Sequence, residues 1–206
     1  ASTMQIMAEA LGLTLPGSAL LPATSQDLRD FAYRAGKQAV WLAKHDLKPR
    51  DIVTMKSFEN AIMVHAAISG STNSLLHLPA IAHEIGFDFD ISLANPISEK
   101  TPNLCHLAPA GHHHMQDLMR AGGISAVMKE LLDGGMLHGD CLSVTGKTLA
   151  ENVKKAKNMD ETVIRPLSDP YSKTGGLAVL FGNLAPNGAI VKRSAVKPEM
   201  LVNTGT

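Results

Sequence analysis

Residues 57–86 read SFENAIMVHAAISGSTNSLLHLPAIAHEIG, and they contain two apolar segments joined by a run of small polar residues. Apolar side chains recur at helical spacing over residues 57–68 and again over residues 75–85, where Gly86 can end the second helix. The joining run, residues 69–73, is typical of a turn. The stretch therefore predicts a pair of consecutive helices with a tight connection.

Helical periodicity continues on both sides of this pair. The second predicted helix of the chain has a start that resembles a capping box, formed by Thr24 and Asp27. Thr148 and Glu151 form a capping box at a later start. The segment 87–107 has no clear period, and we expect loops and one short strand there. The further predicted helices cover residues 3–11, 24–45, 114–121, 124–133 and 148–155.

The pattern changes beyond Asp160. Residues 177–181 (LAVLF) and 189–193 (AIVKR) are rich in β-forming residues, and Pro186, Asn187 and Gly188 provide a turn between them. We therefore expect two strands here, and a domain boundary near residues 159–166.

Composition excludes several classes of function. Nineteen Lys and Arg residues balance nineteen Asp and Glu residues, which argues against a basic nucleic-acid surface or an acidic tail. Hydrophobic residues make up 45% of the chain and charged residues 18%, so we expect a large core or a subunit interface. The apolar runs are far shorter than the ~20 residues of a membrane-spanning helix. The sequence thus indicates neither a nucleic-acid nor a membrane partner.

Cysteine and histidine positions argue against a metal site within this chain. Cys105 and Cys141 are far apart and form no Cys-x-x-Cys pair, so we expect no disulfide framework and no zinc knuckle, and we expect a cytoplasmic protein. Residues 112–114 are three consecutive histidines. Adjacent side chains on a helix point ~100° apart, so a surface patch is favoured over three ligands to one ion.

Two segments invite comparison with anion-binding motifs. Residues 146–148 (GKT) match the end of a nucleotide P-loop, but Cys141 stands where that motif needs its first glycine, so a turn into a capped helix is favoured. Ser71, Thr72 and Asn73 precede a helix. Their side chains can cap its free N–H groups, which spacing favours, or help those groups bind a carboxylate or phosphate.

Five blocks of sequence stand out when the chain is taken as a whole: residues 69–86, 120–131, 142–152, 163–167 and 174–188. In this order they strongly resemble the dihydroxy-acid dehydratase and 6-phosphogluconate dehydratase family. The resemblance covers nearly the whole chain and corresponds to the middle of the family's longer chain. The third block, LSVTGKTLAEN, is more similar to the dihydroxy-acid and sugar-acid dehydratases than to the phosphogluconate branch. The sequence begins ASTM, without an initiator methionine, and we expect an internal piece of a longer protein.

The fold expected with this resemblance is α/β. Helices would flank a mainly parallel sheet, and the first strands of a β-barrel domain would follow. Residues 1–160 would form the C-terminal part of the N-terminal α/β domain. Residues 161–206 would begin the C-terminal β-barrel domain.

The activity implied by the resemblance is that of a hydro-lyase in branched-chain amino-acid biosynthesis, which converts a 2,3-dihydroxy acid to a 2-keto acid. In the family an iron–sulfur cluster acts as Lewis acid, Mg²⁺ holds the carboxylate, and a serine alkoxide takes the proton. None of these groups maps onto this chain, and Cys105 and Cys141 match no cluster motif. We therefore expect the isolated chain to hold no cofactor and to be inactive, and the full-length parent to be a homo-oligomer.

The resemblance carries over one candidate site. Ser71, Thr72 and Asn73 match the family's Gly-Ser-Thr-Asn pattern and are expected to bind the dihydroxy acid, whereas no catalytic residue and no metal ligand is carried over. Ser69 stands where the pattern usually has glycine, and its side chain adds bulk. Two alternatives remain: a sugar-acid or 6-phosphogluconate dehydratase, and a non-catalytic module that holds a small acid.

Overall fold

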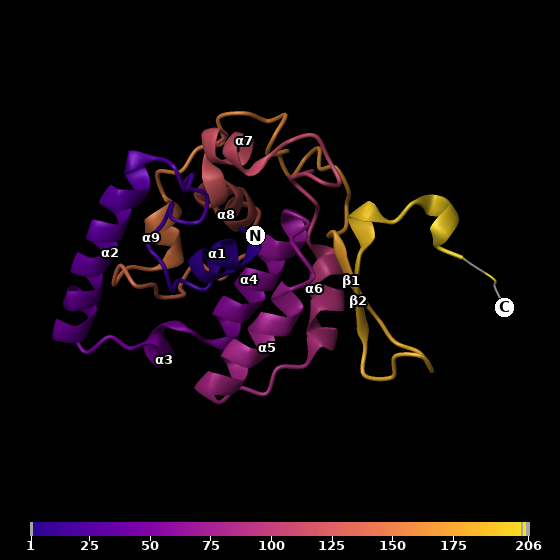
Figure 1. The fold of residues 1–206 in the computed structure, drawn as a ribbon, viewed down its shortest axis with the longest axis horizontal. Coiled ribbons are helices and arrows are strands. Elements are labelled where there is room, and N and C mark those ends of the chain that lie inside the picture. The colour runs from indigo at the N-terminus through magenta and orange to yellow at the C-terminus, as the bar shows by residue number, and fades with distance from the viewer. Residues whose placement is uncertain (1, 203, 205–206) are drawn as a thin grey trace.

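The computed structural model describes residues 2–202 and 204, and most of their regular structure is helical (Figure 1). Short 3₁₀ helices lie at Ile91–Leu93, Arg193–Ala195 and Pro198–Met200. The α-helices and strands are α1 (Thr3–Ala10), α2 (Gln26–Lys44), α3 (Pro49–Ile52), α4 (Met55–Ala67), α5 (Ser74–Ile85), α6 (Ala94–Lys100), α7 (Met115–Arg120), α8 (Gly123–Asp133), α9 (Leu149–Val153), β1 (Leu177–Leu180) and β2 (Ala189–Lys192).

The hydrophobic core surrounds α1, which packs against α4, α5 and α8 in the middle of the molecule (Figure 1). Ile6 and Met7 on α1 and Phe58 on α4 are completely buried. The Phe58 ring also contacts the ring of Phe87, edge to face, at a centroid distance of 6.2 Å. Burying each such side chain contributes about 1.5–3 kcal/mol, so this contact region accounts for much of the stability of the helical body.

A buried carboxylate fastens the loop that follows α1. Glu9 is 5% exposed, and its two carboxylate oxygens accept hydrogen bonds from the backbone N–H groups of Gly17 at 2.9 Å and Ala19 at 3.0 Å. Burial raises the pKa of Glu9, although these hydrogen bonds act in the opposite direction. The single side chain of Glu9 therefore supplies the acceptors for two backbone N–H groups of this loop.

Helix positions agree well with the periodicity of the sequence. The helices predicted at residues 3–11, 57–68, 75–85 and 124–133 are confirmed as α1, α4, α5 and α8, with ends that differ by at most two residues. The start predicted for α2 is wrong: the cap is Ser25, whose hydroxyl accepts from the N–H of Leu28 at 3.3 Å, and not Thr24. The capping box predicted at Thr148 and Glu151 is confirmed.

The sequence did not predict α6, which lies within the segment expected to form loops. The helix has seven residues and carries Pro96 in its first turn, where the missing N–H group costs nothing. Its role is to hold β1: the Asn95 side chain donates to the carbonyl oxygen of Val179 at 2.9 Å and accepts from the N–H of Val179 at 2.8 Å. A helix of seven residues is too short to show a clear helical spacing of apolar residues, so the sequence alone did not reveal it.

Helix α2 lies at the edge of the molecule opposite the strands (Figure 1). None of its residues is buried. Of its apolar side chains, Phe31 and Leu42 are partly buried, whereas Leu28 and Val40 are 38% and 56% exposed. The helix thus covers the body with only part of its apolar side.

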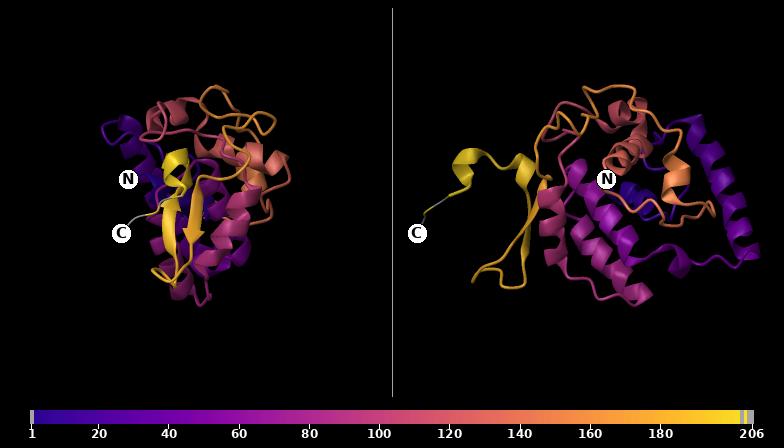
Figure 2. Two further views of the ribbon diagram at one scale, coloured as in Figure 1. Left: turned by 90° about the vertical axis from the view of Figure 1, so that its right-hand side faces the viewer. Right: turned by 180° about the vertical axis from the view of Figure 1, so that it is seen from behind.

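The two strands predicted near the C-terminal end are confirmed. β1 and β2 pair antiparallel, with Leu177 opposite Lys192 and Leu180 opposite Ala189. They lie beside α6 at one side of the helical body, as both views in Figure 2 show. Among residues 2–202 and 204, the observed sheet consists of these two strands. The mainly parallel sheet and the β-barrel domain stay predictions.

Candidate functional site

A cavity of about 310 Å³ lies where α4 ends and α5 begins. Its walls come from the start of α1, the connection between α4 and α5, the segment before α7, and β2. It is therefore formed by parts of the chain that are far apart in sequence. The lining residues are Thr3, Ile68, Ser69, Gly70, Ser71, Thr72, Leu107, Ala108, Pro109, Met115 and Lys192.

The connection between α4 and α5 is tightly packed. Ser69 has φ +49°, in the left-handed region that favours glycine, and its hydroxyl accepts a hydrogen bond from the amide of Asn103. A Cβ atom at Gly70 would lie 2.5 Å from two ring atoms of His65. The sequence of small residues in this turn is therefore explained by the close approach of the histidine ring.

His65 fixes the shape of the turn through two contacts of its ring nitrogen. Its Nε2 atom lies 2.8 Å from the carbonyl oxygen of Ser71 and 2.6 Å from the hydroxyl oxygen of Ser74. Burial lowers the pKa of His65 to about 4, and the positive charge of Lys192 acts in the same direction. The imidazole is neutral at pH 7, and because a carbonyl oxygen only accepts, Nε2 carries the proton.

The structure brings Ser71 and Thr72 to the cavity wall but not Asn73, which is exposed and outside the lining. Asn73 is the N-cap residue of α5 by position, yet its side chain makes no capping hydrogen bond. The first N–H groups of α5 are paired instead with the carbonyl oxygens of Ser71 and Thr72, at 3.2 and 3.1 Å. The interpretation that the Asn73 side chain caps this helix is therefore wrong.

Thr72 offers the free hydrogen-bonding groups of the turn. Within the described residues, neither its N–H group nor its hydroxyl makes a hydrogen bond. The N–H groups on either side are occupied, since Ser71 donates to the Thr3 hydroxyl at 3.2 Å and Asn73 to the Ser71 hydroxyl at 3.4 Å. Thr72, a residue of the cavity lining, therefore has two donors that no described residue occupies.

Lys192 is the charged residue of this cavity, and no motif or periodicity in the sequence marks it as a site residue. It is half-buried on β2, and burial lowers the pKa of its ammonium group. In the part of the chain that the structure describes, no carboxylate oxygen lies within 4 Å of this group. A lysine at the end of a β-rich run usually reaches solvent, so its place in a cavity depends on how the hairpin packs.

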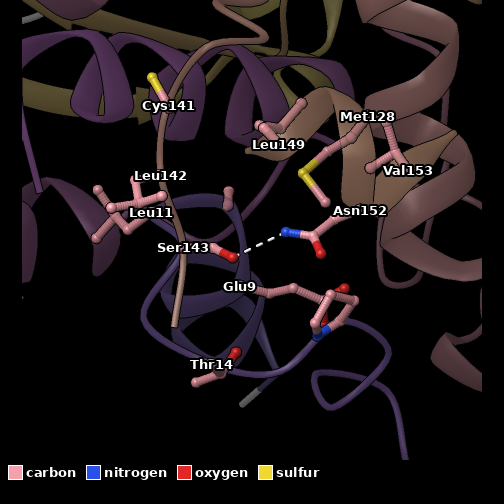
Figure 3. A pocket seen from close by; sticks show the side chains of 13 residues that line it. Glu9, Leu11, Thr14, Met128, Cys141, Leu142, Ser143, Leu149, Asn152 and Val153 are labelled. Carbon is pink, nitrogen blue, oxygen red and sulfur yellow. Dashed lines mark hydrogen bonds between the residues drawn. The ribbon is translucent and has the colours of Figure 1, made fainter. Parts of the chain in front are cut away.

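A second, nearly closed cavity of about 20 Å³ lies beneath the loop after α1 (Figure 3). Its lining includes Glu9 and Cys141, and the amide of Asn152 donates to the Ser143 hydroxyl at 2.8 Å across one side. A space of this size holds about one water molecule, so it belongs to the packing of the core and not to a ligand site.

Two family models divide the chain between them. Residues 1–152 match the model described as dihydroxy-acid/6-phosphogluconate dehydratase N-terminal, and residues 162–206 match the corresponding C-terminal model. The chain belongs to the dihydroxy-acid/6-phosphogluconate dehydratase family. The resemblance seen in the sequence is thereby confirmed.

Curated relatives in this dehydratase family are close in sequence. The dihydroxy-acid dehydratases of Agathobacter rectalis, Lachnospira eligens and Acetivibrio thermocellus are 58%, 57% and 56% identical to the chain over 205 residues. These matches cover 100% of the chain but only 37% of each relative. The chain thus spans little more than a third of the length of the relatives it matches.

The described residues provide no ligand set for the iron–sulfur cluster and Mg²⁺ that the sequence resemblance implies. Cys105 and Cys141 are both buried, and burial raises the pKa of Cys105 to about 12 and also raises that of Cys141. Iron binds the thiolate form, which burial disfavours. No three His, Cys, Asp or Glu side chains among the described residues converge as ligands, the histidines at 112–114 included. No described helix is long and apolar enough to cross a membrane.

The 310 Å³ cavity is lined by residues from both matched segments. Ser71, Thr72 and the other walls belong to the N-terminal match, whereas Lys192 belongs to the C-terminal match. The charged lining residue, Lys192, therefore lies in a different matched segment from the hydroxyl-bearing residues Ser71 and Thr72.

Proposed function

We propose that the whole protein is a dihydroxy-acid dehydratase, a hydro-lyase that converts a 2,3-dihydroxy acid to a 2-keto acid in branched-chain amino-acid biosynthesis. The observation that carries this proposal is identity of 56–58% over the full length of this chain to three relatives of that name. Because the chain spans 37% of those relatives, the activity is proposed for the whole protein and not for the chain alone.

Within that reaction, we assign to this chain the binding of the acid. The cavity beside α5 has the volume of a small organic molecule, and its lining includes Ser71 and Thr72, which both carry hydroxyl groups. The free N–H group of Thr72 adds a donor in the same place. Asn73 lies next to these donors at the surface, where it could contact a part of the ligand or of the protein outside the cavity.

An iron–sulfur cluster and Mg²⁺ are proposed as cofactors of the whole protein, where they would supply Lewis-acid chemistry. We assign no step of the reaction to Cys105 or Cys141, because neither belongs to a group of three or more His, Cys, Asp or Glu side chains that converge among the described residues. The acid-binding role of the cavity does not depend on either cysteine.

The wider organisation is also a proposal. We propose a cytoplasmic homo-oligomer, which is supported by the low share of charged residues, 18%, and by the exposed apolar side chains of α2. The remaining strands of a parallel sheet and of a β-barrel would come from the whole protein. Size-exclusion chromatography with light scattering tests the oligomer, and a mass equal to one subunit would contradict it.

The activity is tested by supplying the whole protein with 2,3-dihydroxy-3-methylbutanoate, gluconate and 6-phosphogluconate in separate assays that detect 2-keto acids. We expect the branched acid to be dehydrated most efficiently. A preference for gluconate or 6-phosphogluconate would make the protein a sugar-acid or phosphogluconate dehydratase. Binding of an acid without any turnover would favour the alternative of a non-catalytic acid-binding module.

A further inference from the structure

We propose that Lys192 binds one of the two carboxylate oxygens of the dihydroxy acid in the cavity beside Thr72. This inference rests on the proposed function for the identity of the ligand. It adds a residue from β2, in the C-terminal family segment, to a site whose other donors lie between α4 and α5.

The charge of the cavity is the first argument. Of the eleven residues that line it, Lys192 alone carries a charge, and no described carboxylate lies within 4 Å of its ammonium group. A half-buried cation without a counter-charge is unfavourable, and a ligand with one negative charge would compensate it. The imidazole of His65, whose pKa the charge of Lys192 helps to lower, is neutral at pH 7 and adds no charge to this balance.

The hydrogen-bonding groups of the wall are the second argument. Thr72 contributes an N–H group and a hydroxyl that have no partner among the described residues, and both can donate to a carboxylate or to a ligand hydroxyl. The lining also includes the apolar residues Leu107, Pro109 and Met115. A cavity that combines a cation, hydrogen-bond donors and alkyl groups suits a small aliphatic hydroxy acid.

The position of Lys192 is fixed by contacts that bring the hairpin against the helices. The N–H groups of Gly175 and Gly176 donate to the carbonyl oxygens of Ser98 at 2.7 Å and Ala66 at 3.2 Å. The Ser98 hydroxyl donates to the carbonyl oxygen of Leu177 at 2.7 Å, and Leu177 is the residue paired with Lys192. The lysine is thus held at the cavity by backbone contacts from both α4 and α6.

The test compares the whole protein with its Lys192→Met variant, which keeps the length of the side chain and removes its charge. Calorimetric titration with 2,3-dihydroxy-3-methylbutanoate is expected to give at least about tenfold weaker binding in the variant, equivalent to about 1.4 kcal/mol. Titration with the carboxamide of the same acid is expected to give the same affinity in both proteins. Lys197→Met serves as the control, because Lys197 is exposed on the same segment and does not line the cavity. Equal acid affinity in wild type and Lys192→Met would overturn the proposal.

A measurement on the unaltered protein covers the case in which Lys192→Met does not fold. Reductive methylation of Lys192, followed by mass spectrometry, is expected to slow at least fivefold when 2,3-dihydroxy-3-methylbutanoate is present, whereas methylation of Lys197 stays constant. If the protein dehydrates the acid but the acid gives Lys192 no protection, the Lys192 proposal fails alone. If the acid protects Lys192 but no dihydroxy acid is dehydrated, the proposed function fails and the carboxylate site stands.

Discussion

The Nε2 atom of His65 lies 2.6 Å from the hydroxyl oxygen of Ser74, and this contact joins α4 to the first residue of α5. The same nitrogen lies 2.8 Å from the carbonyl oxygen of Ser71, to which the Ser74 hydroxyl also donates at 2.9 Å. One buried imidazole therefore fixes both ends of the turn that carries Thr72 toward the cavity.

The stability of the chain is expected to fall in mild acid because of His65. Its pKa is lowered from 6.5 to about 4, so the folded state resists protonation that the unfolded state accepts. The contribution is complete above pH 6.5 and is lost as the pH falls toward 4, with a loss of about 2 kcal/mol between pH 7 and pH 5. Urea unfolding at the two pH values measures it.

The matched variants for this pH effect are His65→Gln and His77→Gln. Glutamine at position 65 can still donate to Ser71 but does not titrate, so the drop in unfolding free energy between pH 7 and pH 5 is expected to shrink. His77 is exposed, and its substitution is expected to leave the drop unchanged. If His65→Gln and wild type lose equal stability in acid, His65 is not the responsible group.

Asn73→Ala is expected to change the unfolding free energy by less than about 0.5 kcal/mol, because the side chain is exposed and makes no capping hydrogen bond. Ser74→Ala is expected to cost about 1–2 kcal/mol, because Ser74 is buried and bonded to His65 and Ser71.

In the whole protein, Asn73→Ala is expected to lower turnover. Normal turnover combined with reduced stability would instead make Asn73 a structural cap.

The helices around the site could be predicted from sequence because their signals are local. The apolar spacing in residues 57–68 and 75–85 defined α4 and α5, and Ser71 and Thr72 were expected near a ligand on the basis of the family's Gly-Ser-Thr-Asn pattern. The interpretation of the Asn73 side chain as a helix cap is wrong, because the first N–H groups of α5 pair with backbone carbonyl oxygens instead of with side chains.

The residues that sequence reasoning missed depend on long-range packing. Lys192 reaches the cavity because Gly175, Gly176 and Leu177 bind to α4 and α6, and no local pattern encodes that contact. His65 occurs in an apolar helix, where its spacing gives no indication that it would bond to Ser74, nine residues further on. Pairings of this kind are visible only when the helices are placed together.

Glu9→Ala is expected to lower the unfolding free energy by about 2–3 kcal/mol, because it leaves the buried N–H group of Ala19 and the N–H group of Gly17 without their acceptor. Glu9→Gln is expected to cost about 1 kcal/mol, since one oxygen still accepts and the charge that burial disfavours is gone. Gln5→Ala is the control, because Gln5 is exposed on the same helix. Urea unfolding ranks the three variants, and equal stability of Glu9→Ala and Gln5→Ala would refute the anchoring role.

Gly176→Ala is expected to separate the hairpin from the turn at Ser69. A Cβ atom at this position would lie 1.9 Å from the Ser69 hydroxyl oxygen and 2.5 Å from its Cβ, so one of the two segments must shift. Overpacking of this kind costs about 1–3 kcal/mol, and acid binding in the whole protein is expected to weaken because the shift moves Lys192 away from Thr72. Gly182→Ala is the control, since nothing lies within 4 Å of a Cβ atom there. Adding Ser69→Gly to Gly176→Ala removes the two nearest of the three Ser69 atoms that the new Cβ would meet and leaves the Cα at 2.9 Å, so part of the stability is expected to return. No recovery in the double variant would place the clash elsewhere.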